Sequence, residues 1–251
     1  VAVSREQLPG SLNGYVQVMY GHGDGTFETP SVLQLAQTSE ALVVTDYDHD
    51  GRLDVIAGSQ QTFNNAFDGL ATVILNTPSG LVEAARLHGT SLYDGTSELH
   101  LADLDGDGRE DIVGVSTGYF TSGVVHGLED GGFGPMSDLG PITNQPSHVF
   151  VGDLNGDGRE DLIWTQRGNS LAVTLATPGG VNLFDLYSVP AIFDGAVGDL
   201  DGDGVADLVV GSPDDSAQGA FAGAVLAWRG GSSPANLVGA PWLLALGDPA
   251  E

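Results

Sequence analysis

Short apolar runs bounded by Gly, Pro, Asn and Asp recur along the whole chain. One set of four covers residues 41–45, 53–59, 71–77 and 81–87, and these runs are rich in Val, Ile, Leu and Ala. Runs of this length with this punctuation are typical of β-strands, because helices need longer segments with a period near 3.6 residues. The pattern therefore predicts an all-β protein.

Four acidic segments repeat within this pattern. They begin at Asp46, Asp103, Asp153 and Asp199, at intervals of 57, 50 and 46 residues. In each repeat one apolar run leads into the acidic segment and three runs follow it. A period near 50 residues with four short strands is typical of a β-propeller blade. We therefore expect a β-propeller of four-stranded blades.

The two ends of the chain carry the strands of one further blade. Residues 1–36 contain three runs that fit second, third and fourth strands, and residues 242–248 fit a first strand. Closing one blade with both termini would remove the open edges that a row of blades would leave. We therefore expect a single domain over residues 1–251 with five blades. Part of a larger, seven-bladed ring is the alternative.

The acidic segments share the pattern D-x-[DN]-x-D-G-x-x-D, with side-chain oxygens at positions 1, 3, 5 and 9 and Gly at position 6. The alternate spacing lets neighbouring carboxylates converge, and the Gly permits a tight turn. Calcium takes about six to eight oxygen ligands in flexible geometry, which these side chains and the position 7 carbonyl can supply. We expect about four calcium ions per chain. The expected ligands are Asp46, Asp48, Asp50, Asp54 and the Arg52 carbonyl; Asp103, Asp105, Asp107, Asp111 and the Arg109 carbonyl; Asp153, Asn155, Asp157, Asp161 and the Arg159 carbonyl; and Asp199, Asp201, Asp203, Asp207 and the Val205 carbonyl.

The EF-hand is the competing calcium motif. It needs a bidentate Glu at position 12 and a helix on each side. Position 12 here is Ala57, Gly114, Trp164 or Val210, and apolar strands flank each loop. The EF-hand is therefore rejected, and an Asp-rich turn that holds no metal is the remaining alternative.

Charge and composition exclude several classes of partner. The chain has 34 Asp and Glu against seven Arg and no Lys, and its formal charge is −27. Such a surface repels nucleic acid and anionic lipid. The acidity is either that of a solvated surface or one that bound cations neutralise, and the positions of the Asp residues favour the second interpretation. The chain has no Cys and no apolar run of about 18 residues, which excludes disulfides and membrane insertion. No signal peptide is visible at Val1, so we expect that one has been removed or that the chain is an excerpt.

The repeats resemble FG-GAP repeats, which in bacteria are also described as VCBS-type repeats. Residues 199–213, DLDGDGVADLVVGSP, and 223–230, GAVLAWRG, are similar to the integrin α pattern, with GSP in place of GAP. The resemblance implies a β-propeller with calcium in the loop between the first two strands of a blade. It also implies an extracellular or cell-surface protein whose ligands meet the opposite face, and here a bacterial source. The second and third repeats lack the GAP-like tripeptide, and the blade closed by both ends has only Asp248.

Loops on the opposite face are the candidates for ligand binding. They include residues 60–69, 92–97 and 213–222, which place aromatic side chains beside Asn and Asp, as a groove for a protein or carbohydrate would. Variable loops with no ligand are the alternative. The candidate ligand-binding residues are Phe63, Asn64, Phe67, Tyr93, Asp94 and Phe221.

Catalytic motifs are absent from the sequence. No H-E-x-x-H, G-x-S-x-G or P-loop pattern occurs, and the paired carboxylates all fit metal ligation. We therefore expect a non-enzymatic binding or adhesion module for a protein or glycan. The alternatives are a domain of, or accessory to, a secreted polysaccharide-active enzyme, and a structural unit of a surface assembly.

Overall fold

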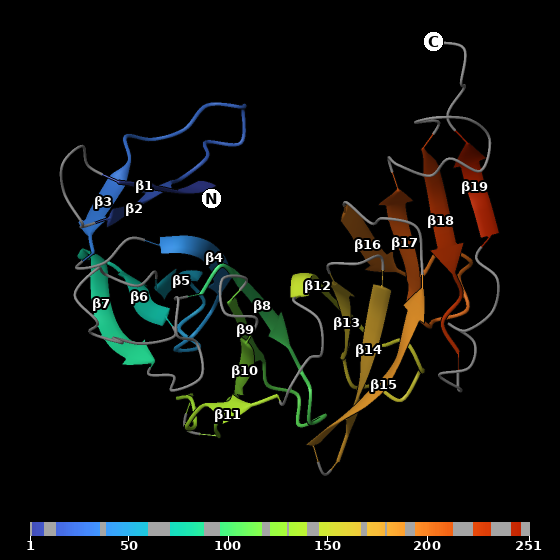
Figure 1. Cartoon of the computed structure of the whole chain (residues 1–251). Coiled ribbons are helices and arrows are strands. Elements are labelled where there is room, and N and C mark those ends of the chain that lie inside the picture. Colours follow the sequence, from blue (N-terminus) through green and yellow to red (C-terminus); the bar gives the residue numbers. More distant parts are fainter. Residues whose placement is uncertain are drawn as a thin grey trace. The chain divides into compact units, whose positions relative to one another are not determined.

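The computed structural model of the chain is built of strands and turns (Figure 1). Among the residues that it describes there is no helix, so the all-β prediction is confirmed. It follows that no helix there has the length and apolarity that a membrane span requires. The described residues are 2–7, 14–35, 39–59, 71–87, 96–116, 121–129, 131–139, 146–166, 170–178, 180–188, 194–212, 223–231 and 242–246.

The strands form small antiparallel sheets that follow one another along the chain. A first compact unit, residues 1–101 and 111–141, holds nearly all of three sheets, in the orders β1-β2-β3, β4-β5-β6-β7 and β11-β10-β9-β8. Their strands are β1 (Ala2–Gln7), β2 (Gly14–Met19), β3 (Ser31–Gln34), β4 (Ser39–Thr45), β5 (Asp54–Ser59), β6 (Ala71–Thr77), β7 (Gly80–Leu87), β8 (Glu98–Ala102), β9 (Asp111–Ser116), β10 (Thr121–Val125) and β11 (Ser137–Asp138).

A second compact unit comprises residues 102–110 and 142–251 and holds two sheets, β12-β13-β14-β15 and β16-β17-β18-β19. Sequential pairing of four short strands is the blade arrangement that the repeats predicted. The single domain over residues 1–251 stays a prediction. The strands are β12 (Pro146–Gly152), β13 (Asp161–Gln166), β14 (Ser170–Thr177), β15 (Gly180–Ser188), β16 (Asp194–Gly198), β17 (Asp207–Ser212), β18 (Ala224–Trp228) and β19 (Trp242–Leu246).

The C-terminal strand differs from the expectation. β19 pairs antiparallel with β18, with Val225 opposite Ala245 and Leu226 opposite Leu243, so it is the fourth strand of the last sheet. The assignment of this segment to a blade shared with the N-terminus was therefore wrong. Its five apolar residues show no polar alternation that would specify a partner, and the neighbouring antiparallel strand takes it. Five sheets are described, and a closed ring of five or seven blades stays a prediction.

The inner strands of each sheet supply the core. Every residue of β5 and of β9 is buried, because these second strands have apolar neighbours on both faces. In the second unit the core joins β13, β14, β17 and β18, and includes Ile163, Val173 and Trp228. The β7 strand is more exposed than β5 and β6, as expected for an outer strand.

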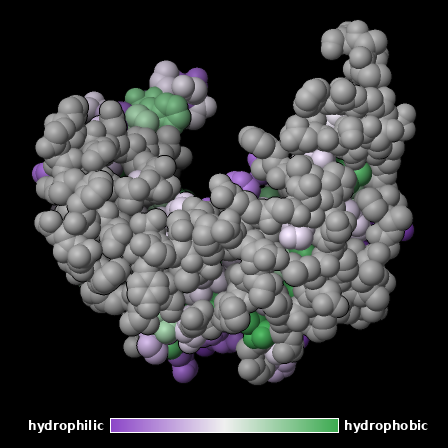
Figure 2. Space-filling view, in the orientation of Figure 1, coloured by the Kyte–Doolittle hydropathy of each residue, from purple (hydrophilic) through white to green (hydrophobic). Residues whose placement is uncertain are grey.

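Apolar side chains on the surface are scattered. On the face drawn in Figure 2, the described hydrophobic residues form a few small areas. The exposed large apolar side chains include Val32, Leu53 and Leu200. Isolated residues of this kind are ordinary on protein surfaces and imply no ligand.

Candidate metal centres in the acidic loops

All four acidic segments lie where the sequence predicts, between the first and second strands of a sheet. We name them loop 1 (46–53), loop 2 (103–110), loop 3 (153–160) and loop 4 (199–206), and number their positions from the first Asp. Position 9 is then the first residue of the second strand. A tight turn at this junction is needed because the two strands are antiparallel neighbours.

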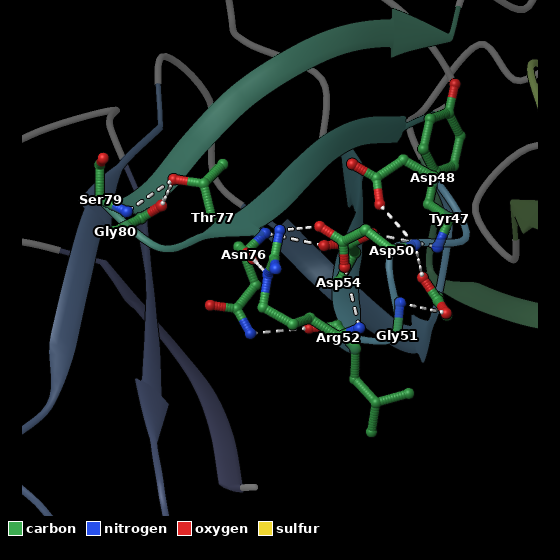
Figure 3. A network of polar contacts seen from close by, with 12 residues as sticks. Tyr47, Asp48, Asp50, Gly51, Arg52, Asp54, Asn76, Thr77, Ser79 and Gly80 are labelled. Atoms are coloured by element: carbon green, nitrogen blue, oxygen red, sulfur yellow. Dashed lines mark hydrogen bonds and ion pairs between the residues drawn. The ribbon is translucent and has the colours of Figure 1, made fainter.

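The Asp at position 1 holds the turn together. In loop 1, Oδ1 of Asp46 accepts the N–H of Asp50 (3.0 Å) and Oδ2 accepts the N–H of Gly51 (2.9 Å), in the network that Figure 3 shows. The chain therefore wraps around this carboxylate. The same pair of bonds joins Asp103 to Asp107 and Gly108, Asp153 to Asp157 and Gly158, and Asp199 to Asp203 and Gly204.

Positions 3 and 5 add oxygens on the same side of the turn. Oδ1 of Asp48 accepts the N–H of Asp50, and Oδ1 of Asp50 accepts the N–H of Arg52. In loop 3, Asn155 replaces Asp at position 3 and accepts the equivalent N–H of Asp157 at 2.9 Å. In three loops, one carboxylate oxygen from each of positions 1, 3 and 5 lies within 4.8 Å of the other two: Asp46, Asp48 and Asp50; Asp103, Asp105 and Asp107; and Asp199, Asp201 and Asp203.

Two positions of the turn require left-handed backbone. Position 6 is Gly in every loop, with φ between 82° and 87°, as the sequence predicts. Position 4 also has positive φ, and three loops place Gly there: Gly106, Gly156 and Gly202. Loop 1 has His49 at this position with φ of 57°, a conformation that costs a side-chain-bearing residue energy.

Position 9 has a different environment from the other predicted ligands. The Asp161 side chain is buried, and its Oδ2 accepts the N–H of Leu154 (3.0 Å) while Oδ1 accepts the N–H of Ala176 (2.8 Å). Both oxygens thus bind backbone, which fastens the loop to the third strand. The equivalent bonds join Asp54 to Tyr47 and Asn76, Asp207 to Leu200 and Gly230, and Asp111 to Gly127. Metal ligation by position 9 stays a prediction.

Burial and backbone donors act in opposite directions on these carboxylates. Burial raises the pKa of Asp161 to about 6, the two N–H donors lower it in part, and the nearby charges of Asp157 and Asp153 raise it further. The exposed Asp199 has its pKa lowered, chiefly by the N–H groups of Gly204 and Gly202. The buried environment of Asp161 disfavours the negatively charged carboxylate, and a bound cation would offset this cost. The backbone donors around Asp199 already stabilise its negative charge.

The residue at position 7 divides the loops into two kinds. Arg52, Arg109 and Arg159 each form an ion pair with the Asp at position 5 of the same loop. Loop 4 has Val205 instead, and there Arg229 pairs with the position 3 residue Asp201 at 3.1 Å. Coordination by the position 7 carbonyl stays a prediction.

The donor set fits a hard divalent cation. Every group at positions 1, 3 and 5 offers oxygen, and most of these side chains are exposed, so an ion could reach them. Calcium suits clustered carboxylates that hold an ion without strict octahedral geometry. Metal binding by these turns stays a prediction.

The candidate ligand-binding residues Phe63, Asn64, Phe67, Tyr93, Asp94 and Phe221 lie outside the described residues, as does Asp248. Sequence reasoning missed two features of the loops. The need for left-handed backbone at position 4 could have been found from the Gly that three loops share there. The contact of Glu160 with Asp103 joins different loops and leaves no periodic signal in the sequence.

Comparison with known families and structures agrees with the repeat pattern. The model of the FG-GAP-like repeat matches residues 3–57, 103–164 and 153–210, and that of the FG-GAP repeat matches residues 193–228. No curated protein sequence matches the chain.

Two solved structures are similar to the chain at low identity. A protein from Lactobacillus plantarum aligns with a TM-score of 0.56 and 15% identity over 97% of this chain and 67% of that chain, a likeness of fold alone. The V. cholerae biofilm matrix protein Bap1 aligns with a TM-score of 0.35 and 17% identity. The alignment covers 84% of this chain and 40% of that chain. The second likeness is too weak to carry an argument about this molecule.

Proposed function

This chain belongs to the FG-GAP repeat family, and from that premise we propose that its four acidic loops bind calcium. The observation that carries the proposal is the convergence of the position 1, 3 and 5 carboxylates to within 4.8 Å in three loops. Loop 3 repeats the same turn with Asn155 in the middle position. A bound ion would offset the mutual repulsion of these charges and fix the turn.

The ions would act as structural staples. The chain has no Cys, so no disulfide can cross-link its small sheets. The position 1, 3 and 5 side chains would hold the ion, and position 9 would connect the loop to the third strand. Binding to the folded loops alone would stabilise the fold by RT ln(1 + [L]/Kd), about 1.4 kcal/mol per site at ten times Kd.

The stabilised sheets would present a non-enzymatic binding surface outside the cell. Family membership supports an extracellular or cell-surface, bacterial module for adhesion to a protein or glycan. The candidate contact residues are those of the loops opposite the acidic ones, Phe67 and Tyr93 among them. An enzyme would need a convergent acid–base or nucleophile set outside the acidic loops, and no catalytic motif of the sequence points to one.

Metal removal tests the calcium proposal directly. We expect EDTA to lower the melting temperature by many degrees, and calcium rather than magnesium to restore it. Metal analysis after dialysis against calcium should find about four ions per chain. A melting curve that EDTA leaves unchanged would exclude the structural role of metal.

A glycan array tests the binding role. Calcium-loaded protein is compared with the variants Tyr93→Ala and Phe67→Ala, which should lose binding and keep their melting temperature. Asp105→Ala is the matched loop variant and should lose stability while it keeps binding at saturating calcium. Loss of binding by folded, calcium-saturated Asp105→Ala would instead assign the ligand to the acidic loops.

A further inference from the structure

Loops 2, 3 and 4 are linked in series within the second unit. The backbone N–H at position 8 of one loop donates to the position 1 carbonyl of the preceding loop. Glu160 of loop 3 donates to Asp103 of loop 2 (3.0 Å), and Ala206 of loop 4 donates to Asp153 of loop 3 (2.9 Å). The first residues of loops 2 and 3 are thus each bonded to the next loop along the chain.

Side chains reinforce this series. The aliphatic part of Arg159 lies over Gly106 so closely that a Cβ there would come within 2.8 Å of Arg159 Cγ. Val205 lies over Gly156 in the same way, with a Cβ-to-Cγ2 distance of 3.1 Å. Position 7 of one loop therefore packs on position 4 of the preceding loop. These side chains add packing contacts to the backbone bonds between the loops.

Glu160 forms a second hydrogen bond between loops 2 and 3, and this bond has no equivalent between loops 3 and 4. Its Oε2 accepts the backbone N–H of Asp103 at 2.9 Å, so one residue holds both the N–H and the carbonyl of Asp103. Ala206, at the same position of loop 4, has no acceptor in its side chain. Loops 2 and 3 therefore have a connection that depends on a carboxylate.

The Glu160 carboxylate lies near other negatively charged side chains. Glu160 is half-buried and is repelled by Asp103 of loop 2 and by Asp153 of loop 3. Both of these residues are position 1 of a proposed calcium site. A divalent cation in either loop would offset this repulsion and so favour the position of Glu160 in which its Oε2 accepts the Asp103 N–H.

We propose that Glu160 is a positioning residue that couples calcium binding in loop 2 to calcium binding in loop 3. The proposal rests on the proposed function, because it concerns how those calcium sites act together. An ion in loop 3 strengthens the bond from Asp103 N–H to Glu160 and so orders the first ligand of loop 2. Because binding free energies are reciprocal, an ion in loop 2 raises the affinity of loop 3 by the same factor.

Calorimetric titration with calcium can measure this factor. A background with Asp50→Ala and Asp203→Ala disables loops 1 and 4 and leaves loops 2 and 3. Adding Asp157→Ala or Asp107→Ala leaves one loop alone and gives its intrinsic affinity. The coupling factor is the ratio of the loop 2 affinity with loop 3 filled to its affinity alone, and we expect at least about fivefold.

Glu160→Gln should bring this factor close to one, because Gln keeps an acceptor oxygen but has no charge. The calcium-free melting temperature should not fall, since the substitution also removes repulsion. Glu28→Gln, at an exposed position outside the acidic loops, is the charge-matched control and should keep the coupling. Glu160→Ala should abolish coupling and also weaken loop 2 when it stands alone.

The outcomes separate the two proposals. Equal coupling in Glu160→Gln and Glu28→Gln would overturn the role of Glu160 and leave calcium binding standing. If Glu160→Gln loses the coupling and also has a lower calcium-free melting temperature, Glu160 has a merely structural role. That result would also overturn its role in coupling. Absence of calcium binding in both single-loop proteins would overturn the proposed function itself.

Discussion

The buried carboxylate of Asp161 accepts the backbone N–H of Ala176 at 2.8 Å, and this bond fastens the end of loop 3 to strand β14. Its other oxygen accepts the N–H of Leu154. One side chain thus joins the loop, the second strand and the third strand of a sheet. Asp54 does the same for loop 1 through Tyr47 and Asn76.

Removing this connection should destabilise the protein even without metal. Asp161→Ala leaves two buried N–H groups without their acceptor, and we expect the free energy of unfolding in EDTA to fall by about 2–4 kcal/mol. Urea denaturation measures the change. Asp157→Ala is the matched control, because it removes an exposed carboxylate of the same loop and should cost no more than about 1 kcal/mol. Equal losses would show that position 9 has no special structural role.

The pH dependence of stability should reflect the same residue. Burial raises the pKa of Asp161 from 3.8 to about 6, so the folded protein binds this proton more tightly than the unfolded chain does. Its contribution to stability is therefore full below about pH 4 and is lost as the pH rises through about 6. In calcium-free protein, the unfolding free energy of the wild type relative to Asp161→Asn should fall by up to about 3 kcal/mol between pH 4 and pH 7. Denaturation at both pH values tests this, and a difference that stays constant or rises would contradict it.

The positions of the acidic loops could be predicted from the sequence because each motif is bracketed by apolar strands. D-x-[DN]-x-D-G-x-x-D fixes a turn, and Gly51 and its equivalents have the left-handed backbone that the turn requires. The antiparallel junction of first and second strands follows from the same punctuation. This is local information, which a sequence carries directly.

Features that depend on contacts distant in sequence could not be predicted. The five apolar residues of β19 would fit several strand positions, and only pairing with β18 shows which one they take. The carboxylate of Asp54 could equally bind a metal or backbone N–H groups, because both need the same oxygens. The bond between Asp103 and Glu160 joins residues 57 positions apart and has no counterpart at Ala206.

His49 should be a cost to loop 1 that glycine relieves. It has φ of 57° at a position where the other three loops have Gly. We expect His49→Gly to raise the unfolding free energy by about 0.5–1 kcal/mol, since relief of the strain exceeds the added entropy of the unfolded chain. Gly106→Ala is the converse test and should destabilise, because φ is 76° and the new Cβ would press on Arg159. Thermal denaturation of both variants in EDTA measures these changes in stability. Destabilisation by His49→Gly would contradict the prediction and indicate that the imidazole makes a stabilising contact.

Arginine at position 7 should weaken calcium binding in the loops that have it. Arg109 pairs with Asp107, which is an expected calcium ligand, so the guanidinium competes with the ion for the same carboxylate and repels it. An exposed ion pair contributes up to about 1 kcal/mol, and Arg109→Val should therefore raise the affinity of loop 2 by about two- to fivefold. Val205→Arg should lower the affinity of loop 4 by a similar factor. Calorimetric titration of proteins with a single intact loop measures both, and Arg86→Val in β7 controls for the change in net charge. If Arg109→Val weakens binding instead, the arginine must hold Asp107 in the geometry that the ion needs.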